Sequence, residues 1–442
     1  MNNSMDSRPF PKRQGTSAHL SGVVCAVYRW LPLALLMGVV GLGEAATVQL
    51  ASNRPPVPLA AGSLEGYNLG NWMPVVEARD ALNVLRPSLL RFPGGNVGDE
   101  QDLTEASFVP LKSNWTMLGK PPLLVQTRLF ALKPDSHNQP ADAAAAVRVT
   151  LAQGLPVRYW EIGNEPDLYA EHRGDPSWTP EKYCGAFRDQ RAAILQVDPH
   201  ALIAGPATSQ PGPWVEQFIR LCGDVVDLLT WHEYPDNGTL SDEAALASVK
   251  RVSDDLAHYQ QLLRDPQANP LGHTRTVQTG VTEYSLSWNT NRARHLSDQV
   301  AGLWAAEATL RLAEGGAQVA TYFALQATGN HGLLDLSGIP RPSYYAMREL
   351  THFQGQALLL QTDDDRLWVH AAQQDRTLTT ILINTATEPV PVSLSLTGWQ
   401  ATGAKGFTAE TVDQEAPLLR LNPSQLVLPP RSFVRVQFKA LP

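Results

Sequence analysis

The feature that most constrains the fold of this chain is a regular alternation of apolar segments with amphipathic helical patterns. Eight short apolar runs read as strands that are covered on both faces. Helical patterns such as 181–197 and 297–315 lie between them. Eight strand–helix units in about 290 residues predict a (β/α)8 TIM barrel over 62–350. A doubly wound sheet is the alternative, but no G-x-G-x-x-G turn follows the first strand. The expected strands are 63–70, 87–95, 123–130, 157–165, 201–207, 225–234, 276–284 and 319–326.

The pattern changes after about Phe353, where short runs alternate apolar and polar residues and no helical period appears. Examples are RLWVHAAQ, LTTILINTA and SFVRVQF, separated by turn-rich gaps. Such a pattern predicts a small C-terminal antiparallel β-sandwich, here over 355–442. The segment 46–61 contains TVQLAS, and we expect it to add a strand to this sandwich.

Length, composition and charge predict a folded globular protein. The chain has 442 residues and 48.3 kDa, which is too long for a single ordinary core of about 100–200 residues. Hydrophobic residues at 43% and charged residues at 18% exclude a disordered or coiled-coil protein. A net charge of −8 and a pI near 5.8 argue against nucleic acid as a partner.

The N-terminal segment 1–45 predicts a secretory signal peptide. An apolar run from Leu31 to Gly43 follows a positively charged stretch, and small residues come after it. The run is shorter than the span of about 20 residues that a membrane helix needs. We therefore expect cleavage after Ala45, no stable membrane insertion afterwards, and a secreted or periplasmic protein. An uncleaved membrane anchor is the alternative. The basic residues of the stretch are Arg8, Lys12, Arg13 and Arg29.

The cysteine content is low. Three cysteines provide neither a disulfide scaffold nor a Cys-rich metal site. Cys25 lies in the expected signal peptide, so Cys184 and Cys222 remain as a pair. In an oxidising compartment this pair forms either a disulfide or two small buried thiols.

Two carboxylates stand where reactive groups are found in such barrels, at the carboxyl ends of strands. Glu165 ends the fourth expected strand and Glu283 ends the seventh. The two therefore lie on opposite sides of the cup that the βα loops form at this end of the barrel. Because residues two apart on a strand share a face, Glu161 is expected to point the same way as Glu165 and to support the site from below. Glu233 is expected to face the helices. Two carboxylates across a pocket are what glycoside hydrolysis requires.

Several motifs carry a resemblance to a known group of enzymes. EIGNEP (161–166) resembles the acid/base motif of clan A glycoside hydrolases, and TEY (282–284) resembles their nucleophile motif. RFPGG (91–95) and WHEYP (231–235) are similar to the second-strand and sixth-strand segments of three of their families. These are the families of α-L-arabinofuranosidases (51), β-xylosidases (39) and heparanase-like β-glucuronidases (79). The resemblance covers nearly the whole chain after the signal segment.

The resemblance implies roles for individual residues. Glu165 would be the general acid and base, and Glu283 the nucleophile. Asn164 would hydrogen-bond the 2-hydroxyl of the sugar. Arg91 would keep the nucleophile ionised by its opposite charge.

Further side chains are expected to line the cup and bind substrate. His232 and Tyr234 alternate onto one face of the sixth strand, although each is also explained as a packed interior residue. Four tryptophans fall in expected loops on the same side, and one or two of them should form platforms for sugar rings. They are Trp72, Trp115, Trp178 and Trp288, of which we include Trp288 in the site.

These observations predict a retaining O-glycoside hydrolase that cleaves a polysaccharide or oligosaccharide through a two-carboxylate double displacement. The partner is a carbohydrate, and no cofactor or metal is implied, because H-E-x-x-H and similar ligand spacings do not occur. The alternative from another class is a carbohydrate-binding or polymer-handling protein on the same barrel that has lost efficient turnover.

Overall fold

A computed structural model describes most of the chain after the expected signal peptide. That segment, with Cys25, lies outside the described residues except for Ala45. In the described part, no helix is both long enough and apolar enough to cross a membrane. The described residues are 45–51, 55–101, 103–130, 139–289, 296–327, 331–408 and 426–441.

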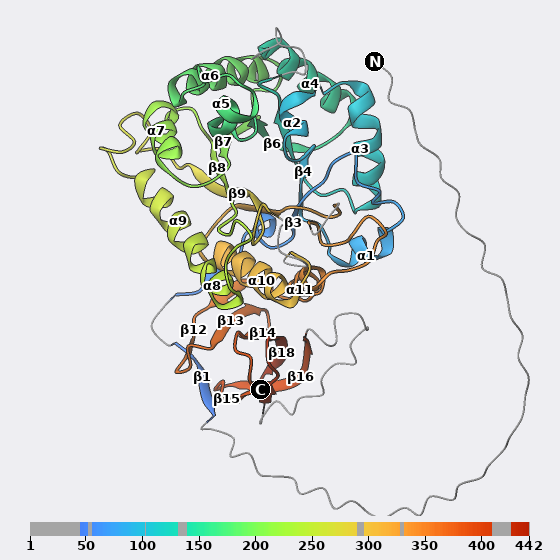
Figure 1. Cartoon of the computed structure of the whole chain (residues 1–442), viewed down its shortest axis with the longest axis vertical. Helices are drawn as coiled ribbons and strands as arrows, with labels where there is room; N and C mark the ends of the chain where they lie inside the picture. The colour runs from blue at the N-terminus through green and yellow to red at the C-terminus, as the bar shows by residue number, and fades with distance from the viewer. Residues whose placement is uncertain are drawn as a thin grey trace, which may run out of the picture. The chain divides into compact units, whose positions relative to one another are not determined.

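Eight parallel strands close into a barrel, which confirms the predicted fold class (Figure 1). Neighbours around the barrel follow the order β10-β3-β4-β5-β6-β7-β8-β9, and every adjacent pair is parallel. The strands are β3 (Gly66–Asn68), β4 (Leu89–Phe92), β5 (Leu123–Thr127), β6 (Val157–Ile162), β7 (Leu202–Thr208), β8 (Leu228–Glu233), β9 (Gln278–Tyr284) and β10 (Val319–Tyr322).

Helices surround the barrel, and local sequence explains where several of them begin (Figure 1). Proline occupies the first turn of α4, α6, α7 and α11, where its missing N–H costs nothing. Asp298 caps α10 by accepting from the Ala301 N–H at 2.9 Å. The helices are α1 (Arg79–Val84), α2 (Val97–Glu100), α3 (Glu105–Met117), α4 (Pro140–Gln153), α5 (Tyr169–His172), α6 (Pro180–Val197), α7 (Pro213–Cys222), α8 (Asp242–Ala247), α9 (Val249–Leu262), α10 (Gln299–Glu314) and α11 (Pro342–Leu350), with 3-10 turns η1 (Ala61–Ser63) and η2 (Pro166–Leu168).

The barrel interior has an apolar layer with a polar layer directly above it. The apolar layer is a cluster of buried residues from six strands, including Leu89 and Leu124. Because alternate residues share a face, Arg91 and Gln126, two positions further along these strands, also point inward. Both are completely buried. The strands thus place polar groups on an apolar floor, at the end of the barrel where the βα loops begin.

The C-terminal part consists of two packed sheets around a second apolar core. One sheet has the order β12-β1-β15-β17 and the other β16-β18-β14-β13-β11-β2. The expected all-antiparallel pairing needs one correction: β1 runs parallel to β15, because the N-terminal segment enters between two strands of opposite direction. The strands are β1 (Ala46–Leu50), β2 (Val57–Pro58), β11 (Gln356–Leu358), β12 (Leu360–Thr362), β13 (Leu367–Gln374), β14 (Thr377–Asn384), β15 (Val390–Leu394), β16 (Trp399–Phe407), β17 (Leu426–Leu428) and β18 (Ser432–Ala440).

Buried ion pairs fasten the sandwich to the barrel. His370 on β13 bonds Glu307 of α10 at 2.8 Å and Glu314 of the same helix at 2.9 Å. Arg435 on β18 donates to Glu349 of α11 at 2.9 Å. These contacts fix the two parts against each other through side chains that are mostly shielded from water.

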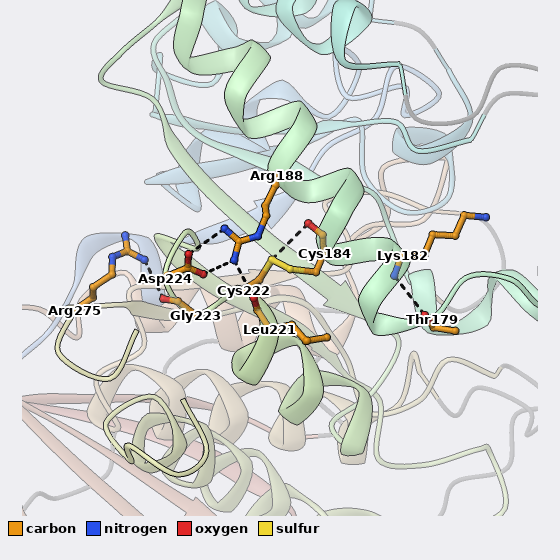
Figure 2. Close-up of a disulfide and its surroundings, with 9 residues drawn as sticks. All are labelled: Thr179, Lys182, Cys184, Arg188, Leu221, Cys222, Gly223, Asp224 and Arg275. Atoms are coloured by element: carbon orange, nitrogen blue, oxygen red, sulfur yellow. Dashed lines mark hydrogen bonds and ion pairs between the residues drawn. A yellow bond between two sulfur atoms is a disulfide. The ribbon is translucent and has the colours of Figure 1, made fainter. Parts of the chain in front are cut away.

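Cys184 and Cys222 form a disulfide that joins α6 to α7, with their Cα atoms 5.9 Å apart (Figure 2). Of the two alternatives left open by the sequence, the bridged pair is therefore the one found. Beside the bridge, Arg188 of α6 binds Asp224 at 2.6 Å and the Leu221 carbonyl at 2.9 Å (Figure 2). The bridge and the ion pair connect the same two segments on the outside of the barrel.

Candidate active site

The two expected catalytic carboxylates reach the cup by different routes. Glu283 is part of β9, whereas β6 ends at Ile162, three residues before Glu165. The expectation that the strand continues to Glu165 is therefore wrong, since Gly163 and Glu165 have φ values of 77° and 50°. A Cβ on Gly163 would lie 2.7 Å from Leu129, so glycine is needed for this turn. The turn, not strand alternation, aims Glu165 inward.

Glu165 and Glu283 nevertheless face each other across the cup. One carboxylate oxygen from each, together with a ring nitrogen of His232, lie within 4.8 Å of one another. The His232 Nδ1 atom is 3.0 Å from Glu165 Oε1 and 3.8 Å from Glu283 Oε2. Retaining glycosidases keep their carboxyl groups about 5–5.5 Å apart, and inverting ones about 6.5–9.5 Å. The oxygen positions here match the shorter class.

Glu283 receives three hydrogen bonds that favour its charged form. Arg91 Nη1 donates to Oε1 at 2.6 Å and the Gly95 N–H donates to the same oxygen at 3.1 Å. The Tyr234 hydroxyl donates to Oε2 at 2.8 Å. Burial alone would raise the pKa of Glu283, but the His232 and Arg91 charges and the Tyr234 hydroxyl hold that pKa below its usual value. Glu283 is thus prepared to act as an anion.

His232 contacts both carboxylates, and their charges affect the pKa of its ring. The ring is completely buried, which by itself would lower its pKa. The Glu283 charge and the hydrogen bond to Glu165 outweigh burial and raise the pKa of His232 above its usual value. A protonated His232 donates to Glu165 and adds positive charge beside Glu283.

Arg91 lies behind the carboxylates with no exposed surface. Besides Glu283, its guanidinium binds Glu161 at 2.6 Å, Asn68 at 3.0 Å and Asn164 at 2.9 Å. Arg91 was expected among the substrate-binding residues, but its donors point at protein groups. Arg91 therefore lies where it orients the side chains that it contacts. Glu161, expected as support below the site, is the partner that holds its Nε atom.

The amide of Asn164 has a fixed orientation. Its oxygen accepts from Arg91 and from Gln126 Nε2 at 3.1 Å. Its nitrogen donates to Asn96 Oδ1 at 3.2 Å and retains a second N–H. Directly before Glu165, that N–H is suited to a hydroxyl of the bound sugar.

The four tryptophans separate into two groups. Trp72 follows β3 and Trp288 follows β9, and they are 41% and 61% exposed on the catalytic side. Trp178 is buried against Phe130 and Tyr169. The expected loop position of Trp115 is wrong: it lies in α3, buried, and its indole N–H donates to the Pro121 carbonyl. Only the first two are therefore placed to meet a sugar.

Further groups that hold the site were not predicted from the sequence. Asn68 accepts from Arg91, and Gln126 accepts the Gly94 N–H at 2.8 Å while donating to Asn164. Asn96 accepts from Asn164, and the Gly95 N–H donates to Glu283. A usable signal existed for Gln126, since its side-chain amide follows directly on the apolar run LLV of the expected strand. The Gly95 N–H belongs to the backbone, so the residue type does not indicate that it donates to Glu283.

Glu233 lies outside the cup, on the other face of β8 from His232. It accepts from the Trp231 indole at 2.8 Å. Burial, with the charge of Asp255 on α9, raises its pKa to about 8. This agrees with the expectation that Glu233 faces the helices.

Glu165, His232 and Glu283 are also the side chains in the described part of the chain that come close enough together to ligate a metal ion. The site already contains a cation, because Arg91 contacts Glu283 directly. The raised pKa of His232 favours the protonated ring, which cannot ligate a metal. These residues therefore fit a proton-transfer site better than a metal centre.

A parallel barrel with two facing carboxylates at its loop end has the architecture of glycoside hydrolases, and the sequence relatives belong to that class. A β-xylosidase from Caldicellulosiruptor saccharolyticus is 25% identical over 249 residues, which are 52% of this chain and 49% of that protein. A heparanase from Rattus norvegicus is 25% identical over 221 residues, 48% of this chain and 39% of that protein. The chain spans half or less of the length of these curated relatives. No family model matches it.

Solved structures share the whole architecture. A family 51 α-L-arabinofuranosidase from Bifidobacterium longum superimposes with a TM-score of 0.69 at 15% identity, covering 89% of this chain and 99% of that one. A monomeric β-xylosidase from Caulobacter crescentus CB15 gives 0.66 at 18% identity, covering 90% and 100%. These likenesses show the fold. Together with the sequence relatives, they confirm the expected resemblance to clan A glycoside hydrolases.

Proposed function

We propose that this chain is a retaining O-glycoside hydrolase that acts on a polysaccharide or an oligosaccharide. The observation that carries the proposal is the approach of a Glu165 and a Glu283 oxygen to within 4.8 Å, with Glu283 held as an anion by Arg91 and Tyr234. At this separation no water fits between the nucleophile and the anomeric carbon, so the carboxylate attacks directly.

The reaction proceeds in two displacements. In the first, Glu283 forms a bond to the anomeric carbon while the glycosidic bond breaks and Glu165 gives its proton to the leaving oxygen. In the second, Glu165 takes a proton from water, whose oxygen displaces Glu283 from the same carbon. Two inversions leave the product with the original anomeric configuration. Glu165 is protonated again at the end, and Glu283 is again an anion.

The neighbouring residues support these steps. Arg91, the Gly95 N–H and Tyr234 hold Glu283 in position and disperse its charge. His232 lies beside both carboxylates, and its Nδ1 atom donates to Glu165 while that carboxyl is ionised. The free N–H of Asn164 contacts the 2-hydroxyl, and Trp288 borders the entrance.

Two variants distinguish the roles of the carboxylates. Glu283→Ala removes the nucleophile, so turnover of chromogenic glycosides should fall by about 10⁴-fold or more, and azide should restore a glycosyl azide of inverted configuration. Glu165→Ala should lose least activity on nitrophenyl glycosides, whose leaving group needs no proton, and azide should there give a product of retained configuration. Wild-type rates in both variants would refute the assignment. Carbohydrate binding without turnover of any glycoside would favour the alternative binding protein.

We also propose that the protein is secreted or periplasmic. Support comes from the signal-like segment 1–45 and from the disulfide between Cys184 and Cys222, a bond typical of oxidising compartments. N-terminal sequencing of the exported protein should begin at Ala46. Recovery of an intact N-terminus with the membrane fraction would indicate the uncleaved anchor instead.

A further inference from the structure

We propose that an open cleft next to the catalytic cup is a subsite for a neutral sugar unit of the substrate, with Trp72 as its stacking platform. The inference rests on the proposed function and adds the position and chemical class of a part of the substrate away from the cleaved bond. The cleft has a volume of about 480 Å³, in the range of about 300–1,000 Å³ usual for small-molecule sites. Its lining residues are Asn71, Trp72, Phe92, Pro93, Val97, Gln101, Leu103 and Ser107.

The cleft opens on the catalytic side of the barrel. Trp72 lies in the connection that follows β3, and Pro93 and Val97 lie in the one that follows β4, so both connections leave the carboxyl ends of strands. The segment 93–97 borders the cleft and the cup at once. Its Gly95 N–H donates to Glu283 at 3.1 Å, while Pro93 and Val97 line the cleft. A saccharide chain that occupies both the cup and the cleft therefore passes over the short segment 93–97.

Trp72 is held in place although the residue is 41% exposed. A Cβ on Gly70 would lie 2.2 Å from the Trp72 Nε1 atom, so only glycine allows the indole to rest on the backbone there. The adjacent Asn71 donates to the Ser107 carbonyl at 2.9 Å, which ties the loop to α3. A platform fixed before the ligand arrives loses little conformational entropy on binding.

The lining matches a neutral sugar in its chemistry. Five lining residues are apolar or aromatic, which suits the C–H face of a sugar ring packed on an indole. Asn71, Gln101 and Ser107 add amide and hydroxyl groups for the ring hydroxyls. Among the described lining residues none is charged, so the carboxylate of a uronic acid would lose water there without gaining a cation. The cleft should therefore select neutral over acidic sugars.

Affinity electrophoresis tests the subsite on a protein that cannot degrade its ligand. Glu283→Gln protein is run in native gels that contain arabinoxylan, xyloglucan or mixed-linkage β-glucan as neutral polymers, and polygalacturonate as the acidic one. We expect at least one neutral polymer to retard it. Adding Trp72→Ala should weaken that binding by about tenfold or more, because truncating an aromatic anchor removes most of its contact. Trp72→Phe should keep binding within about threefold.

Leu271→Ala is the matched control, since Leu271 is a 56% exposed apolar residue in the segment that leads into the opposite end of the barrel at β9. It should not alter retardation. In an otherwise wild-type chain, Trp72→Ala should raise KM for the retarding neutral polymer by a larger factor than KM for an aryl monoglycoside, because a single sugar does not extend to the cleft.

The subsite proposal is overturned if Trp72→Ala binds every neutral polymer like its parent, if only polygalacturonate retards the protein, or if no polymer does. A KM that rises by the same factor for the monoglycoside and the polymer would overturn it too, by placing Trp72 at the cleaved bond. If the proposed hydrolase function is wrong, no glycoside would be hydrolysed. Polymer binding would still depend on Trp72 in that case, so the two proposals fail in different ways.

Discussion

Tyr234 shows how a hydroxyl contributes to the charge state of the candidate nucleophile. Its O–H donates to Glu283 at 2.8 Å and is one of the groups that keep the pKa of Glu283 low. A hydrogen bond to a charged group contributes about 1.5–3 kcal/mol, so kcat/KM of Tyr234→Phe should fall by about ten- to a hundredfold. The direction of the pH effect is also set. Removing a group that lowers the pKa of Glu283 raises it, so the acidic limb of the pH–rate profile should move to higher pH.

The pH dependence of kcat/KM for wild type and Tyr234→Phe is the measurement. Tyr259→Phe is the control, because that hydroxyl lies on α9 and accepts from the Gly212 N–H and not from a group of the cup, so the acidic limb should stay in place. An acidic limb that moves to lower pH in Tyr234→Phe would contradict the assigned role.

At the scale of elements, the disulfide joins two helices that do not carry the site. The bridge closes a segment of 38 residues between α6 and α7. A loop of that length stabilises the folded state by about 3–4 kcal/mol in the chain-entropy model. Replacing Cys184 and Cys222 together by serine should therefore lower the free energy of unfolding by about that amount, as measured by urea denaturation.

The same double variant should retain its kcat at temperatures below its lowered Tm, because the helices lie outside the barrel and the carboxylates on other elements. Wild-type protein treated with a reductant should reproduce the loss of stability. An unchanged denaturation midpoint in both would show that the bridge contributes nothing to stability.

At the scale of the whole molecule, His370 joins the sandwich to the barrel in a pH-dependent way. Burial opposes its charge, but Glu314 and Glu307 raise its pKa to about 10 in the folded protein. The unfolded value is near 6.5. Because the folded pKa is the higher one, this stabilisation is fully present below about pH 6.5 and is lost as pH rises toward about 10.

His370→Ala should lower the free energy of unfolding by about 3 kcal/mol at pH 6, since it leaves buried carboxylates without one partner. The difference from wild type should shrink between pH 6.5 and 10 when unfolding is followed by urea titration. His258→Ala is the control: its pair with Glu216 is half exposed, and an exposed pair contributes about 0–1 kcal/mol. A difference that grows with pH would reverse the assignment.

Much of the fold could be predicted because it is encoded in local patterns. Apolar runs with helices between them indicate covered parallel strands, and the loss of helical period after Phe353 marks the sandwich. Motifs placed Glu165, Glu283, Asn164 and Arg91 together at one end of the barrel. These residues form a site because parallel strands bring their carboxyl ends to a common face, which is a property of the sheet and needs no further detail.

Other features were decided only by the tertiary structure, since they depend on which distant segments meet. Nothing near Asn68 in the sequence shows that it bonds Arg91 of β4. The position of Gln126 in an apolar run likewise does not reveal that its partner is Asn164. Strand alternation does not foresee the left-handed turn that aims Glu165. The sequence by itself thus determined the strands, the barrel and the two carboxylates, because periodicity and residue type are local. Three-dimensional packing decided their partners, their charge states and the attachment of the sandwich, because those arise from contacts across the chain.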